Sequence, residues 1–106
     1  MKLALFLLPR AEADIDDHCA FIAKTNIEKA IAFDLAVFES FEQLSEMPLI
    51  GAEREYLNPK LFDLRIWFVK DFKKYLIFYR PFSTYIEIVR VLHSARDIDS
   101  IISEDE

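Results

Sequence analysis

The chain has 106 residues, 53% of them hydrophobic, so we expect one compact domain over residues 1–106 rather than a disordered segment. Its single glycine excludes a glycine-rich phosphate loop and a dinucleotide-binding fingerprint. Its single cysteine excludes an internal disulfide, which agrees with a reducing cytoplasm.

The net charge of −6 is distributed unevenly along the chain. Residues 1–60 carry six basic and eleven acidic side chains, residues 61–96 carry seven basic and three acidic ones, and residues 97–106 add five acids and no base. A basic segment attracts anionic partners, whether a nucleic acid or an acidic protein segment. An ordinary solvated sheet surface would have the same composition, so charge alone does not choose between the two interpretations.

The first predicted elements are a short strand and a helix. Residues 3–8 form an apolar strand that Pro9 ends, either as a strand terminus or as a helix start. The run is too short for a signal peptide or a membrane span, so we expect a soluble cytoplasmic protein with no membrane contact. Residues with the spacing of one helical face follow: Ala11, Ile15, His18, Cys19, Ile22. Glu12, Asp14, Asp16 and Asp17 crowd the first two turns, where they complement the helix dipole and are solvated.

A break near residues 25–28 separates this helix from a second one. Thr25 and Glu28 have capping-box spacing and Asn26 is an equally good N-cap, so two starts remain possible. The apolar face of the second helix comprises Ala30, Phe33, Val37, Phe41 and Leu44, widened by Leu35 and Phe38. So short a connection predicts an antiparallel hairpin, and the second helix should end near Met47, because a residue before proline avoids the helical region.

The second half of the chain predicts strands. Residues 48–61 lose any periodic pattern and are expected to form a loop. Three runs rich in β-branched and aromatic residues follow, at 64–69, 75–80 and 85–93, with turns at 71–74 and 81–84. These runs predict an antiparallel meander.

The end of the chain predicts a short helix in an acidic tail, residues 98–106. Ser94 has the spacing of an N-cap to Asp97, and Ile98, Ile101 and Ile102 form the apolar face of this helix. The predicted fold class is α+β: an N-terminal strand, a helical hairpin, a three-stranded antiparallel meander that completes one twisted sheet, and a short C-terminal helix.

Short motifs occur in a defined order along nearly the whole chain. In the helical half they are Ala13-Asp14-Ile15, Phe21-Ile22-Ala23, Asn26, Ala30, Phe33, Leu44, Pro48 and Gly51. In the strand half they are Leu64-Arg65, residues 75–80 (YLIFYR) and residues 88–97 (IVRVLHSARD). In order and spacing these motifs resemble ParE-type toxins of the RelE/ParE superfamily, the plasmid-stabilisation proteins.

The resemblance implies the toxin of a type II toxin-antitoxin system, bacterial and kept silent by an antitoxin that wraps a tail over its surface. ParE-type members resemble inhibitors that trap DNA gyrase on cleaved DNA. RelE-type members cut messenger RNA on the ribosome. The fold does not decide between these targets, because function depends on the site.

A nuclease of this kind needs a general base, a general acid and cations around the phosphate. The candidate cations are Arg65, Arg80, Arg90 and Arg96, and the candidate acids and bases are Glu87, His93, Tyr79 and Tyr85. In a regular strand Glu87 and His93 would face the same side, about 20 Å apart at about 3.3 Å per residue, too far to serve one phosphodiester. Tyr75 or Tyr79 from a neighbouring strand could still lie near either residue. The weak catalytic candidates are therefore His93, Arg65 and Arg90, and the alternative role for His93 is to hydrogen-bond the turn that follows it.

Two other side chains attract attention as possible ligands. His18 is interpreted as a histidine packed at the edge of the core, and Cys19 points about 100° away from it on a helix, so we expect no metal site and no cofactor.

Trp67 is either an anchor for a partner or part of a strand covered on both faces. Asp97 is expected to cap the last helix.

The leading hypothesis is a toxin that binds and inhibits DNA gyrase without being an enzyme, because no convincing acid-base pair is found. A ribosome-dependent RelE-type endoribonuclease is the alternative, which the sequence pI of about 4.9 disfavours. A degenerate, non-toxic antitoxin-binding module is a third. We expect no sequence-specific contact with nucleic acid.

The expected partner is a ParD-like antitoxin of the ribbon-helix-helix type, bound by strand addition or in a helical groove. Its tail should contact Arg65, Trp67, Arg80, Arg90 and Arg96. Replacing Arg80 and Arg90 with Glu should then weaken the complex.

Overall fold

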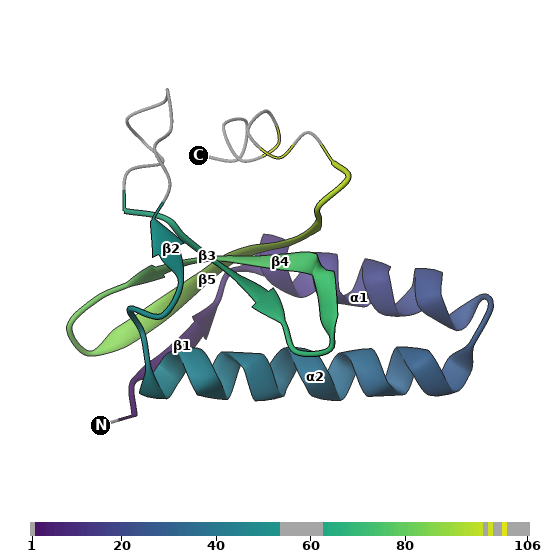
Figure 1. Cartoon of the computed structure of the whole chain (residues 1–106), viewed down its shortest axis with the longest axis horizontal. Helices are drawn as coiled ribbons and strands as arrows, with labels where there is room; N and C mark the ends of the chain where they lie inside the picture. The colour runs from purple at the N-terminus through teal and green to yellow at the C-terminus, as the bar shows by residue number, and fades with distance from the viewer. Residues whose placement is uncertain (1, 54–62, 97, 99–100, 102–106) are drawn as a thin grey trace.

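The computed structural model describes residues 2–53, 63–96, 98 and 101 and is drawn in Figure 1. The helices are α1 (Pro9–Ala23) and α2 (Ile27–Glu46), and the strands are β1 (Ala4–Leu7), β2 (Ala52–Glu53), β3 (Arg65–Val69), β4 (Phe72–Pro81) and β5 (Tyr85–His93). The two helices form the predicted hairpin and pack on one face of the sheet. Among the residues that the structure describes, neither helix has the length and apolar composition of a membrane span.

The strands form one five-stranded mixed sheet in the order β1-β5-β4-β3-β2. Strands β3, β4 and β5 pair antiparallel in chain order, and β1 joins the edge of β5 in parallel. The two-residue strand β2 lies in a segment that was predicted to be loop, and it pairs antiparallel with β3. Strand β4 begins at Phe72 rather than at residue 75, so the turn predicted at 71–74 is present but shorter. The chain reverses at Lys70 and Asp71, whose φ of 65° is left-handed; aspartate tolerates that region.

The helix ends follow local chemistry. Pro9 occupies the first turn of α1, where its missing N–H costs no hydrogen bond. At the start of α2 the Asn26 side chain accepts a hydrogen bond from the Lys29 N–H at 3.0 Å, so Asn26 is the N-cap of the two candidates. Helix α2 ends at Glu46, close to the predicted end before Pro48.

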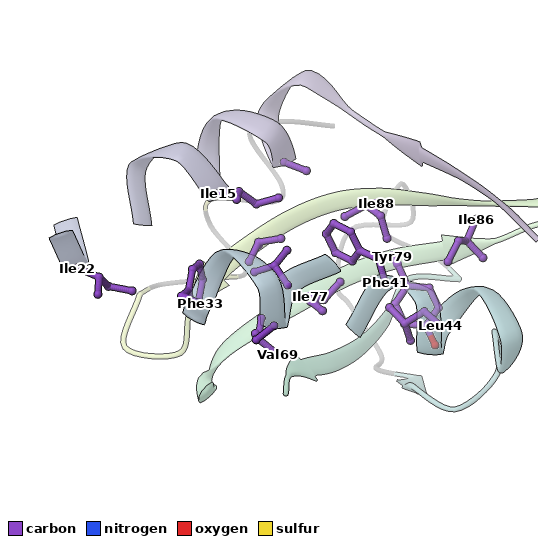
Figure 2. Packing of buried hydrophobic residues seen from close by; sticks show 14 of the residues in the cluster. Ile15, Ile22, Phe33, Phe41, Leu44, Val69, Ile77, Tyr79, Ile86 and Ile88 are labelled. Atoms are coloured by element: carbon purple, nitrogen blue, oxygen red, sulfur yellow. The ribbon is translucent and has the colours of Figure 1, made fainter. Parts of the chain in front are cut away.

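The main core lies between the hairpin and the sheet (Figure 2). Side chains that are 0% exposed come from both layers: Phe33, Val37, Phe41 and Leu44 from α2, and Ile77, Tyr79, Ile86, Ile88 and Val91 from β4 and β5. Leu35 and Phe38 do not widen this face as predicted, since they are 61% and 49% exposed. The face of α2 that packs on the sheet is therefore narrower than its apolar composition suggests.

A second apolar cluster covers the other face of the sheet. It comprises Leu64, Phe78, Val89, Leu92 and Ile98. Ile98 and Ile101 are helical, and both pack in or against this cluster. The rest of the predicted final helix, with Asp97 and Ile102, lies outside the described residues.

Candidate functional site

Arg65, at the start of β3, holds the segment that follows α2. Its Nη1 donates to the carbonyl oxygens of Gly51 at 2.8 Å and Leu49 at 3.3 Å, and its Nη2 forms an ion pair with Glu53 at 3.1 Å. The Arg65 side chain is only 18% exposed. Three of its contacts thus tie it to the protein itself, which leaves it poorly placed to reach a substrate phosphate.

Tyr79 fills the space beneath the same segment. Its hydroxyl donates to the Pro48 carbonyl and accepts from the Gly51 N–H, each at 2.8 Å. A Cβ on Gly51 would lie 2.5 Å from this hydroxyl oxygen, so any larger residue would force Tyr79 to shift. Burial raises the pKa of Tyr79, although the hydrogen bond from Gly51 and the charge of Arg65 oppose the rise. Tyr79 therefore stays protonated near neutral pH and serves as a hydrogen-bonding support of the fold.

Arg90 forms the most buried ion pair among the described residues, with Asp14 of α1. Its Nε and Nη2 donate to the two Asp14 carboxylate oxygens at 2.7 Å and 2.8 Å, and both side chains are about nine-tenths buried. One Asp14 oxygen also accepts from the Val91 N–H at 3.1 Å. The interpretation of Asp14 as a solvated acid at the helix dipole is therefore wrong: Asp14 crosses from α1 to β5 and clamps the two elements together.

His18 completes this attachment of α1 to β5. Its Nε2–H donates to the Val91 carbonyl at 2.8 Å, and its ring contacts Phe33 and Tyr75 edge to face. The prediction of a histidine packed at the edge of the core is confirmed. Its neighbour Cys19 has a pKa raised by burial and by nearby acids, Asp34 first among them. No group of three potential metal ligands occurs among the described residues.

The alternation of β5 is interrupted in its middle. Tyr79 pairs with Ile88 but Phe78 pairs with Arg90, so Val89 is an extra residue in the ladder. As a result Ile88 and Val91, three residues apart, both pack in the main core. Such a bulge reverses the face of the sheet to which each later side chain in the strand points.

Because of this bulge, the prediction that Glu87 and His93 face the same side of the sheet is wrong. Glu87 alternates with Ile86 and Ile88, so it faces away from the helices, where it forms an ion pair with Arg80 at 3.4 Å. His93 follows Val91 on the helix side, and its ring contacts Tyr75 at 5.0 Å. The two residues therefore face opposite sides of the sheet. His93 Nδ1 accepts a hydrogen bond from the Ala95 N–H at 3.0 Å, which is the structural role considered for it.

The remaining partner-binding candidates differ in exposure. Trp67 is half-buried against the main core, donates to the Gln43 side chain at 3.3 Å and stacks on Phe68. Arg80 is 18% exposed in its ion pair with Glu87, whereas Arg96 is exposed. Of the five side chains expected at a partner, Arg96 alone is exposed.

These contacts belong to a fold with known relatives. A sequence model of the family described as ParE toxin of type II toxin-antitoxin system, parDE, matches residues 5–98. The chain belongs to this ParE toxin family. The ParE-family match includes every candidate site residue from Arg65 to Arg96 and both halves of the clamp between Asp14 and Arg90.

A solved structure supports the fold of this ParE-family chain. The structure of the chromosomal ParDE TA system from P. aeruginosa is similar with a TM-score of 0.70, 20% sequence identity, and coverage of 87% of this chain and 96% of that chain. At that identity the likeness concerns the fold. No curated protein matches the sequence.

Proposed function

We propose that this ParE-family protein inhibits DNA gyrase by binding it, and that it acts in the cytoplasm unless a ParD-like ribbon-helix-helix antitoxin neutralises it. The observation that carries the proposal is the separation of Glu87 and His93, the carboxylate and imidazole candidates for acid-base chemistry. Glu87 and His93 face opposite sides of the sheet, and each already has an internal partner, Arg80 for Glu87 and the Ala95 N–H for His93. General acid-base cleavage needs both groups within hydrogen-bonding reach of one phosphodiester.

The arginines support the same conclusion. A ribonuclease would direct several cations at one phosphate. Here Arg65 is bound to the segment after α2, Arg80 to Glu87 and Arg90 to Asp14, on different parts of the sheet. These arginines hold the fold together, which favours a toxin that presents a surface over one that performs chemistry.

The antitoxin would reach the accessible basic residues at one end of the sheet. Lys73, Lys74 and Arg96 are exposed, and the Lys74 carbonyl accepts from the Ser94 N–H at 2.7 Å, which brings β4 and the end of β5 together. We propose that Arg96, with Trp67 as an apolar contact, belongs to this interface. Arg90 would become available only if its clamp to Asp14 opened.

Induction of the chain in bacteria without an antitoxin tests the proposal. Growth should stop while gyrase-cleaved DNA accumulates, and purified protein should inhibit gyrase supercoiling. His93→Ala is the matched control and should remain as toxic as the parent. Cleaved messenger RNA with unaffected gyrase would instead identify a RelE-type endoribonuclease, and harmless expression would identify a non-toxic antitoxin-binding module.

A further inference from the structure

Helix α2 carries an apolar ridge on the side that faces away from the sheet. Ile27, Ile31, Leu35 and Phe38 follow one another at spacings of four, four and three, so they lie along one helical face. They are 68%, 59%, 61% and 49% exposed, respectively. Figure 1 shows α2 along one side of the molecule with the sheet beyond it, so the opposite side of α2 faces outward. We call these four residues the α2 ridge.

The fold does not need this ridge. The inner face of α2 already supplies Phe33, Val37 and Phe41 to the core, each 0% exposed. A helix with a single apolar face buries that face and presents polar residues to water. The second apolar face of α2 is buried by none of the described residues, and a contiguous exposed apolar patch of this kind marks an interaction surface.

The charge beside the ridge limits what can cover it. Acids lie three or four residues from a ridge member and share its side of the helix: Glu28, Asp34, Glu39 and Glu42. Lys29 is the sole basic residue of α2, and it lies two residues from both Ile27 and Ile31, off the ridge. Lys70 and Lys2 pair with Glu39 and Glu42, but these pairs are more than half exposed and so contribute little.

A second copy of the chain is a poor fit for this surface. Packing one α2 ridge on another would place the same four acids against each other, and like charges across an interface disfavour association. An amphipathic helix with lysine or arginine beside its own apolar stripe gains from both features, because the apolar residues are covered and the charges are complementary. The occupant is therefore a basic helix from a different protein.

We infer that the α2 ridge docks a basic amphipathic helix of the antitoxin, at a site separate from the basic end of the sheet. The inference rests on the proposed function, because the antitoxin supplies the helix. It assigns the antitoxin two contacts of opposite charge: lysine and arginine on the acidic α2 ridge, and acidic or polar groups near Arg96.

The test measures how tightly the antitoxin encoded beside the toxin gene binds purified toxin variants by calorimetry. Ile31→Glu with Leu35→Glu should weaken binding about 100-fold, because a charged side chain enters the centre of the apolar contact. Ala13→Glu with Ala20→Glu adds the same charge at two exposed positions of α1 and is the matched control, which should bind like the parent. Glu42→Lys should weaken binding about tenfold at low salt and less at high salt.

A crosslinking arm identifies the occupant. A photoreactive phenylalanine analogue at Leu35 should crosslink to a segment of the antitoxin that carries lysine or arginine at helical spacing. Crosslinking to a second copy of the toxin would overturn the inference. Equal affinity of the ridge variant and the control variant would overturn it too, while leaving antitoxin pairing intact. Failure of the parent toxin to bind the antitoxin would refute antitoxin pairing, and this inference with it.

Discussion

Removal of the Asp14 carboxylate should be among the most damaging single changes in this protein. The carboxylate accepts three hydrogen bonds at 2.7, 2.8 and 3.1 Å, two of them from the buried Arg90 guanidinium. Breaking a buried ion pair from one side costs about 3–5 kcal/mol, because the other charge stays in the interior without its counterion. Since small domains are stable by about 5–15 kcal/mol, Asp14→Ala should lose a large share of the total.

Urea unfolding followed by circular dichroism measures this loss. With a slope of roughly 1.5 kcal/mol per molar urea, the midpoint should fall by about 2 M or more. Asp16→Ala is the control, because Asp16 is an exposed acid on the same helix and should change stability by about 0.5 kcal/mol or less. If Asp14→Ala does not fold, Asp14→Asn can be measured instead. It retains the shape of the side chain but removes its charge, so it should show a smaller loss of stability.

A double replacement distinguishes the contribution of the ion pair to stability from that of side-chain packing. Asp14→Leu with Arg90→Met removes both charges together, so it should recover much of the loss seen for Asp14→Ala. It should not recover all of it, since the Val91 N–H still lacks its acceptor. An Asp14→Ala variant as stable as Asp16→Ala, or a coupling energy between Asp14 and Arg90 below about 1 kcal/mol, would refute the reasoning.

Three further predictions concern the contact between Tyr79 and the segment that follows α2, and the end of β5. Gly51→Ala should lower stability by about 1–3 kcal/mol in thermal unfolding, because its Cβ meets the Tyr79 ring. Ala52→Gly, at the neighbouring exposed position of β2, should cost no more than about 0.5–1 kcal/mol through backbone entropy. The pKa of Tyr79 is raised in the folded protein above its value of 10 in the unfolded chain. The contribution of Tyr79 to the free energy of unfolding is therefore fully present below pH 10 and is lost as the pH rises through the folded-state pKa. Tyr79→Phe should therefore unfold with a flatter pH dependence than the parent above pH 10, and parallel curves would contradict this. His93→Ala should cost about 1 kcal/mol through its lost hydrogen bond while toxicity on induction is unchanged; loss of toxicity at normal stability would reinstate His93 as a catalytic candidate.

Local chemistry made the elements of this fold predictable. The apolar spacing of α1 and of the inner face of α2 follows the helical period, and the β-branched and aromatic runs follow the strands. Pro48 marked the end of α2, and the hairpin followed from the short connection after Ala23. Each of these signals lies within a few residues of the feature that it predicts.

The contacts that define the site were less accessible, because they join distant parts of the chain. Asp14 and Arg90 are 76 residues apart in sequence. A sequence signal for Asp14 did exist: it lies three residues from Ala11 and four from His18, on the buried face of α1. The extra residue Val89 left no comparable signal, because the amino-acid pattern of an apolar strand is the same with or without a bulge. The prediction that His93 and Glu87 face the same side of the sheet was therefore wrong.

The buried clamp also changes how the expected antitoxin contacts should be tested. Arg90→Glu would place a second carboxylate against Asp14 in the interior, so weakened binding by that variant would report unfolding rather than a lost contact. Arg96→Glu is the better substitution, since Arg96 is exposed. It should weaken the antitoxin complex at unchanged stability if the basic end of the sheet is part of the interface.

Folding redistributes the charge that looked divided along the chain. Arg65 and Arg90 from the basic segment are neutralised by Glu53 and Asp14 from the acidic one, and Lys70 pairs with Glu39. The linear sequence pointed to an anionic partner because seven basic residues cluster in 61–96. In the folded protein Arg65, Arg80 and Arg90 are mostly buried in ion pairs, while the acids beside the α2 ridge remain on the surface. A partner selected by charge therefore needs a cationic segment to bind α2. An acidic segment of a partner would bind favourably only where basic side chains are exposed, at Lys73, Lys74 and Arg96.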